Sequence, residues 1–112
     1  MIGAGPFGLA ALKALRQVGV PAVGYEIAGE VGGAWNRSGP RRRVFESTHL
    51  RSSQPFTQFP DFPMPFDAAQ YPSHQEVLAY LKRYASHFGL YDGIRFGSDV
   101  TGVRAVDDGI EV

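Results

Sequence analysis

The chain has 112 residues, 44% of them hydrophobic and 20% charged, a balance typical of one globular domain or part of one. Basic and acidic residues number 11 each, so no net charge favours nucleic acid or an anionic membrane as a partner. The absence of cysteine excludes disulfides and thiolate catalysis, and without a signal segment or a bilayer-length apolar run we expect a cytoplasmic location and no membrane segment in these residues.

The first predicted elements, over residues 1–35, are a strand stub, a glycine turn, a helix and a second strand over residues 22–26. Pro6 suits a first helical turn, where its missing N–H costs nothing, and Gly19 supplies a left-handed stop. Between them apolar residues recur at helical spacing, at Leu9, Leu12, Leu15 and Val18. A right-handed crossover through this helix makes the two strands parallel.

Residues 36–72 are predicted to be irregular, because prolines there exclude long helices and central strands. These prolines are Pro40, Pro55, Pro60, Pro63, Pro65 and Pro72. The same region is rich in aromatic residues, and we expect it to pack against the rest of the fold and to be functional. The aromatic residues are Trp35, Phe45, Phe56, Phe59, Phe62, Phe66 and Tyr71.

Residues 73–90 are predicted to form a helix that begins with a capping box of Ser73 and Glu76 and ends at Gly89. Its apolar stripe consists of Val77, Leu78, Leu81, Tyr84, Ala85 and Phe88. Residues 91–112 are predicted to form short strands over 94–96, 100–106 and 110–112, the last two joined by a hairpin turn at Asp107–Gly109.

The glycine turn carries the first functional signal, the spacing G-x-G-x-x-G at Gly3, Gly5 and Gly8. After a strand and before a helix, this spacing is typical of a dinucleotide site. Gly3 allows the tight turn, Gly5 lets a pyrophosphate approach the backbone, and Gly8 lets the helix pack closely on the strand. The amides at the helix start then point at the phosphates.

Glu26 is the second signal, because parallel strands place it on the same edge of the sheet as the glycine turn. An acidic side chain there can accept both ribose hydroxyls of an adenosine, and it would repel a 2′-phosphate. We therefore expect this site not to hold NADP. The competing interpretation is a surface glutamate at the end of a strand.

Gly32, Gly33, Ala34 and Trp35 follow closely, where many FAD proteins carry a glycine pair. Two glycines let the backbone come near the ribityl and pyrophosphate region of FAD. The competing interpretation is an ordinary Gly-Gly turn with Trp35 as a plug of the core, and for Trp35 alone the two interpretations are equally good.

Taken together, Gly3–Leu9, Glu26 and Gly33–Trp35 resemble the FAD fingerprint of the flavin-containing monooxygenases. Phe59–Pro65 resembles the phenylalanine–proline segment of that family, and Tyr71–Leu90 resembles the helix that follows it. The resemblance covers nearly the whole chain.

The resemblance implies an α/β fold, a Rossmann-like FAD-binding domain with a parallel sheet. It also implies an enzyme that binds FAD here and NADPH mainly elsewhere, and that oxygenates soft nitrogen or sulfur atoms of a small molecule through a C4a-hydroperoxyflavin. On this basis the cofactor-binding residues are Gly3, Ala4, Gly5, Pro6, Phe7, Gly8, Glu26, Gly33, Ala34 and Trp35. Both ends of the sequence read as interrupted elements, so we expect a fragment that is inactive alone.

The sequence departs from the family between Thr48 and Gln54, where family members commonly carry a Thr-Asn pair and this chain has no Asn. Either Ser52 or Ser53 supplies the polar group instead, or the monooxygenase chemistry is altered, and no catalytic residue is assigned. A Baeyer–Villiger monooxygenase, another FAD-dependent oxidoreductase and a nucleotide-binding module without turnover remain as alternatives.

The remaining polar residues give weaker signals. Arg41, Arg42 and Arg43, with Arg37 nearby, are interpreted as a solvated loop rather than a phosphate grip. The three histidines lack metal-ligand spacing, and no metal is expected.

Overall fold

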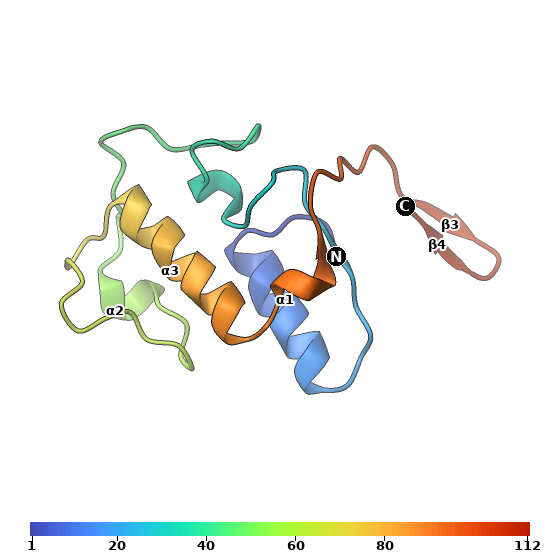
Figure 1. The fold of residues 1–112 in the computed structure, drawn as a ribbon, viewed down its shortest axis with the longest axis horizontal. Coiled ribbons are helices and arrows are strands. Elements are labelled where there is room, and N and C mark those ends of the chain that lie inside the picture. The colour runs from blue at the N-terminus through green and yellow to red at the C-terminus, as the bar shows by residue number, and fades with distance from the viewer.

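The computed structural model describes residues 1–112 as short elements joined by long irregular connections (Figure 1). In chain order they are α1 (Pro6–Gln17), β1 (Gly24–Tyr25), the 3₁₀ helix η1 (Gly33–Trp35), α2 (Gln54–Thr57), α3 (His74–His87), the 3₁₀ helix η2 (Tyr91–Gly93), β2 (Ile94–Arg95), β3 (Arg104–Val106) and β4 (Gly109–Glu111). Residues of both α1 and α3 are buried in a single hydrophobic core.

A small parallel sheet confirms the predicted α/β class. β1 pairs in parallel with β2, with Gly24 opposite Ile94, and Ile2 forms a parallel bridge to Tyr25 of β1. β1 therefore lies between the start of the chain and β2. Its ladder is shorter than the strand predicted over 22–26, because its partner β2 has only two residues and follows η2 directly.

α1 begins and ends as predicted, with Pro6 in its first turn and Gly19 at φ 73° after its last. Leu9 and Leu12 are fully buried, and each contributes about 1.5–3 kcal/mol of burial free energy. The buried apolar stripe of α1 is shorter than predicted, because Val18, at the end of the helix, is 73% exposed.

α3 has the predicted capping box, in which the Glu76 amide donates to Ser73 Oγ at 3.4 Å and the Ser73 amide donates to Glu76 Oε2 at 2.8 Å. Val77, Leu81, Tyr84 and Ala85 of the predicted stripe are buried, whereas Leu78 and Phe88 are half-buried. Tyr80 is also buried, although it lies outside that predicted stripe. Its hydroxyl accepts from the Phe59 amide at 2.8 Å and donates to the Phe62 carbonyl at 2.5 Å.

The packing predicted for the aromatic residues of the irregular region is wrong for four of them. Phe59, Phe62 and Trp35 pack against the core, and the first two lie against the rings of Tyr80 and Tyr84. The others are exposed; they are Phe45, Phe56, Phe66 and Tyr71.

The predicted hairpin at the end of the chain is confirmed as β3 and β4, which pair antiparallel with Arg104 opposite Glu111. It projects away from the rest of the fold and is exposed throughout (Figure 1). The first of these strands begins at Arg104 rather than residue 100, because its partner β4 has only three residues and the last of them, Glu111, pairs with Arg104. None of the helices is long and apolar enough to span a membrane.

Candidate nucleotide-binding site

The glycine turn joins the first bridge of the sheet to α1. The Gly3 amide donates to the Tyr25 carbonyl at 2.8 Å, and Gly3 has φ 87°, a conformation that favours glycine. A Cβ on Gly8 would lie 2.0 Å from the Gly3 carbonyl oxygen. Only glycine at position 8 therefore lets the start of α1 pack this closely on the backbone of Gly3.

The start of α1 leaves amide groups without partners. Gly5 is the N-cap and gives no side-chain cap, the first turn has no acidic residue, and the amides of Gly5, Phe7 and Gly8 make no hydrogen bond. Free amides at a helix N-terminus, with the positive end of the helix dipole, are suited to bind an anion.

The Glu26 side chain lies directly after β1 and is only 4% exposed. Its Oε2 accepts from the Ala4 amide at 2.6 Å, and its Oε1 accepts from the Ala28 amide at 2.8 Å. Each carboxylate oxygen can still accept a further hydrogen bond. Glu26 is therefore a buried, oriented acceptor at the edge of the sheet, not a surface glutamate.

The glycine pair makes close backbone contacts within the protein. Gly33 has φ 54°, and a Cβ on it would lie 2.9 Å from Gly5 Cα. Gly32 has φ 121°, and its Cβ would lie 2.4 Å from Leu78 Cδ1 of α3. Both glycines are thus needed to seat this segment between the glycine turn and α3. Trp35, at the end of η1, is half-buried at the edge of the core.

Two hollows lie beside the contact between Gly5 and Gly33, the first lined by both glycines and the second by Pro6 and Trp35, which follow them closely in the sequence. One, of about 200 Å³, is bounded by the carboxyl end of β1, by the glycine turn and by later loops; it includes Gly3, Gly5, Glu26, Gly33, Ala34, Arg41 and Asp99. The other, of about 270 Å³, is mainly apolar; it includes Pro6, Phe7, Trp35, Thr57, Phe59 and Tyr80. We call them the polar hollow and the apolar hollow.

Some of the predicted cofactor-binding residues line one of the two hollows, and others, Ala4 and Gly8, line neither. Neighbours in the sequence take opposite sides, since Gly5 and Ala34 line the polar hollow while Pro6, Phe7 and Trp35 line the apolar one. Phe7 is 92% exposed and lies on the apolar side. Ala4 is fully buried with its amide bound to Glu26 and its carbonyl to Gly32, so it lines neither hollow.

The structure adds residues that sequence reasoning missed. Arg41 lines the polar hollow and pairs with Asp99 at 3.2 Å, whereas Arg37 pairs with Glu46 away from it. Only the basic run pointed to Arg41, and nothing in the sequence separated it from Arg42 and Arg43. All three arginines of the run are exposed, as expected of a solvated loop, and the Arg41 side chain is 70% exposed although it borders the polar hollow.

The segment that lacks the family Asn lies near the apolar hollow. Of its neighbours, Thr57 lines that hollow, and the Ser52 hydroxyl lies 2.7 Å from the Thr57 hydroxyl. Ser52 and Ser53 do not line it. The residues with hydroxyl groups that line this hollow are therefore Thr57 and Tyr80, and no motif indicated Thr57.

Acidic and histidine side chains form no group suited to a metal ion. His74 is 3% exposed in the first turn of α3, and its Nε2 has no hydrogen-bond partner.

Three comparisons relate this geometry to known proteins. The chain is 35% identical over 132 residues to the Arabidopsis thaliana protein named flavin-containing monooxygenase FMO GS-OX-like 5, covering 98% of this chain and 29% of that protein. The solved flavin-containing monooxygenase of Stenotrophomonas maltophilia superposes with a TM-score of 0.82 at 31% identity, over 97% of this chain and 31% of that one. Oxidized steroid monooxygenase bound to NADP gives a TM-score of 0.77 at 27% identity, over 96% of this chain and 20% of that one.

The chain thus spans less than a third of the length of each of these proteins. The profile of the family described as flavin-binding monooxygenase-like matches residues 1–111. The chain belongs to the flavin-binding monooxygenase-like family.

Proposed function

We propose that this chain binds FAD and forms the FAD-binding part of an NADPH-dependent monooxygenase. The observation that carries the proposal is a pair of hollows beside the contact between Gly5 and Gly33: both glycines line the polar hollow, and Pro6 and Trp35, which follow them closely in the sequence, line the apolar one. A ligand that lies across this contact meets a polar hollow and an apolar hollow in succession. FAD has this character, with an adenosine and a diphosphate at one end and a fused ring at the other.

The residues present fit such a ligand. The free amides of Gly5, Phe7 and Gly8 are donors for the diphosphate, and the absence of a side chain on Gly5 leaves the backbone open to it. Glu26 accepts from the ribose hydroxyls, because its two amide partners orient the carboxylate and leave acceptor capacity on both oxygens.

The apolar hollow shields the ring end from water. Phe7, Trp35 and Phe59 supply its apolar walls, and Thr57 supplies a hydroxyl. When bound, FAD supplies the redox and oxygen chemistry, and the protein supplies binding, orientation and exclusion of water.

NADPH is proposed to bind mainly to residues other than these. The chain has one glycine motif of this kind, and the charge of Glu26 disfavours a 2′-phosphate beside it. The proposed substrate is a small molecule with a soft nitrogen or sulfur atom. The cytoplasmic location stays a prediction from sequence.

A second candidate is a Baeyer–Villiger monooxygenase, which inserts oxygen beside a carbonyl. The similarity to steroid monooxygenase favours this candidate.

The two candidates are separated by NADPH oxidation measured on the full-length gene product with a thioether, a tertiary amine and a cyclic ketone. The proposal expects NADPH consumption coupled to sulfoxide or N-oxide. Coupling to a lactone supports the Baeyer–Villiger candidate, and bound flavin that NADPH does not reduce contradicts both.

A further inference from the structure

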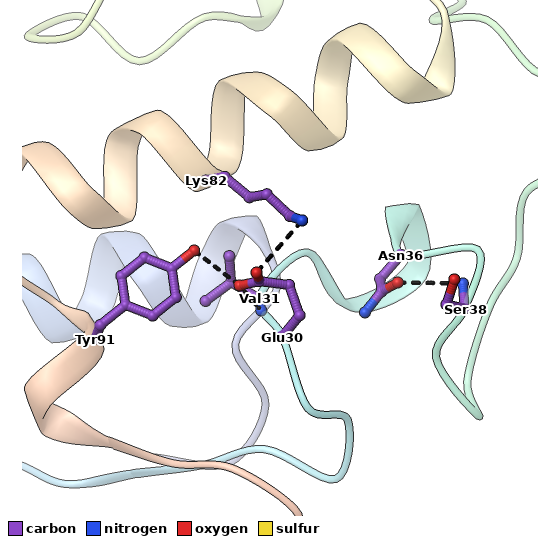
Figure 2. Close-up of polar contacts among 6 residues, drawn as sticks. All are labelled: Glu30, Val31, Asn36, Ser38, Lys82 and Tyr91. Atoms are coloured by element: carbon purple, nitrogen blue, oxygen red, sulfur yellow. Dashed lines mark hydrogen bonds and ion pairs between the residues drawn. The ribbon is translucent and has the colours of Figure 1, made fainter.

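Outside the two hollows, Glu30 joins three segments that are far apart in the sequence (Figure 2). Its Oε1 accepts from the Tyr91 hydroxyl at 2.7 Å and from the amide of Val31 at 2.8 Å. Its Oε2 pairs with Lys82 Nζ of α3 at 3.3 Å. A single carboxylate therefore ties the loop after β1 to α3 and to η2.

This contact is strongest at Tyr91. Burial raises the pKa of Tyr91, and the charged Glu30 raises it further, so the hydroxyl stays a donor at any ordinary pH. Burial also raises the pKa of Glu30, but the hydrogen bonds from Tyr91 and Val31 and the charge of Lys82 outweigh that effect and lower it. The Lys82 pair is weaker, because its side chain is 43% exposed and water screens the charge.

The loop that Glu30 holds is the one that carries the glycine pair. Glu26 fixes its beginning through the Ala28 amide, and Glu30 fixes it through the Val31 amide just before Gly32. The Gly32 amide then donates to the Ala4 carbonyl at 2.9 Å, and Gly33 lies against Gly5. A displacement of this loop would therefore move Gly33 relative to Gly5.

We infer that Glu30 is a positioning residue for the proposed FAD site, held by Tyr91 and Lys82 so that Gly33 stays against Gly5. The inference rests on the proposed function, because it concerns the affinity for FAD. Glu30 itself lines neither hollow, so its effect on FAD acts through the glycine pair.

Three variants of the full-length gene product separate this role from general stabilisation. Tyr91→Phe removes the hydroxyl alone, Glu30→Ala removes the whole tie, and Glu30→Gln keeps an oxygen that accepts from Tyr91 and Val31. Tyr71→Phe is the matched control, since Tyr71 is half exposed and its hydroxyl makes no hydrogen bond.

The Kd for FAD is measured by quenching of flavin fluorescence on protein shown to be folded by circular dichroism. Tyr91→Phe and Glu30→Ala are expected to raise Kd about tenfold, the usual effect of losing one hydrogen bond to a charged group. Glu30→Gln is expected to raise it less than Glu30→Ala, and Tyr71→Phe not at all.

A second readout needs no flavin, namely hydrogen exchange of the Gly32 amide in the apoprotein. The inference expects this amide to exchange faster in Tyr91→Phe than in the wild type, while core amides of α1 keep their rates. Unchanged Gly32 exchange, or an unchanged Kd in both Tyr91→Phe and Glu30→Ala, overturns the inference alone. Absence of FAD binding by the wild type overturns the proposed function, and the inference with it.

Discussion

At the scale of single residues, the site depends on glycines, whose lack of a side chain lets backbone segments pack closely together. Gly8 and Gly33 each occupy a place where a Cβ would meet backbone, 2.0 Å from the Gly3 oxygen in one case and 2.9 Å from Gly5 Cα in the other. Backbone cannot move aside as a flexible side chain can. These glycines are therefore required by protein contacts before any ligand binds.

Gly8→Ala is expected to destabilise the protein by about 1–3 kcal/mol, the usual cost of forcing extra volume into a packed site. The free energy of unfolding is measured by urea denaturation. Gly102→Ala is the matched control, because a Cβ there meets nothing within 4 Å. Equal stability of the two variants would show that the turn and α1 are not packed as described.

Glu26→Gln is expected to weaken FAD binding by about 1.5–3 kcal/mol, because a charged acceptor becomes a neutral one. It is also expected to lower stability by about 1–3 kcal/mol, since one buried amide, of Ala4 or Ala28, then faces a donor. Flavin fluorescence and urea denaturation measure the two effects. Glu111→Gln should leave FAD affinity unchanged and lower stability by less than about 1 kcal/mol, because its ion pair with Arg104 is exposed and screened by water. Unchanged FAD affinity in Glu26→Gln would exclude the ribose role.

At the scale of elements, α3 is the support on which both the aromatic turn and the glycine pair rest. Tyr80 holds the Phe59 and Phe62 backbone, and Leu78 fills the space beside Gly32. Ser73, the N-cap of α3, lines neither hollow, so a substitution there is expected to change the stability of this support without changing a residue of the site.

Ser73→Ala is expected to cost about 0.5–2 kcal/mol, because the capping box loses its side-chain acceptor for the Glu76 amide. Ser86→Ala, on the exposed side of the same helix, should cost much less. Urea denaturation compares the pair. A Ser73→Ala variant as stable as Ser86→Ala would mean that the capping box contributes nothing.

Glu76 adds a dependence on pH. Hydrogen bonds from the Ser73 backbone and hydroxyl lower the pKa of Glu76 below its ordinary value of 4.5. A carboxylate with a lowered pKa contributes stability above its unfolded pKa, and this contribution is lost as the pH falls through the folded pKa. The stability gap between wild type and Glu76→Ala should thus narrow between about pH 7 and about pH 3.

Urea denaturation at both pH values tests this expectation. Gln75→Ala is the control, because the exposed side chain of Gln75 carries no charge. The difference in stability between wild type and Gln75→Ala should therefore not depend on pH. A gap for Glu76→Ala that stays constant or widens in acid would contradict the charge-assisted cap.

At the scale of the whole molecule, the sequence predicts what local patterns determine. Pro6, Gly19 and the Ser73–Glu76 box set the helix boundaries because each acts on its own turn. The position of Glu26 can also be predicted from the sequence, since a parallel crossover puts the ends of both strands, and so Glu26 and the glycine turn, at the same edge of the sheet.

The remainder depends on partners that local patterns cannot indicate. Tyr91 meets Glu30 across 61 residues, and Arg41 meets Asp99 across 58. The packing of the aromatic residues depends in the same way on distant partners. Phe59 and Phe62 lie against Tyr80 and Tyr84 of α3, whereas Phe56 and Phe66 are exposed. These contacts follow from how irregular segments lie in three dimensions, on which proline and glycine spacing has no bearing.

The central claim is that FAD lies across the contact between Gly5 and Gly33. Titration of FAD into the purified apoprotein of the full-length gene product, followed by flavin fluorescence, tests it most directly. The structure predicts saturable quenching with one FAD per chain, weakened in Glu26→Gln and unchanged in Glu111→Gln. A folded wild type that leaves flavin fluorescence unchanged would contradict the claim.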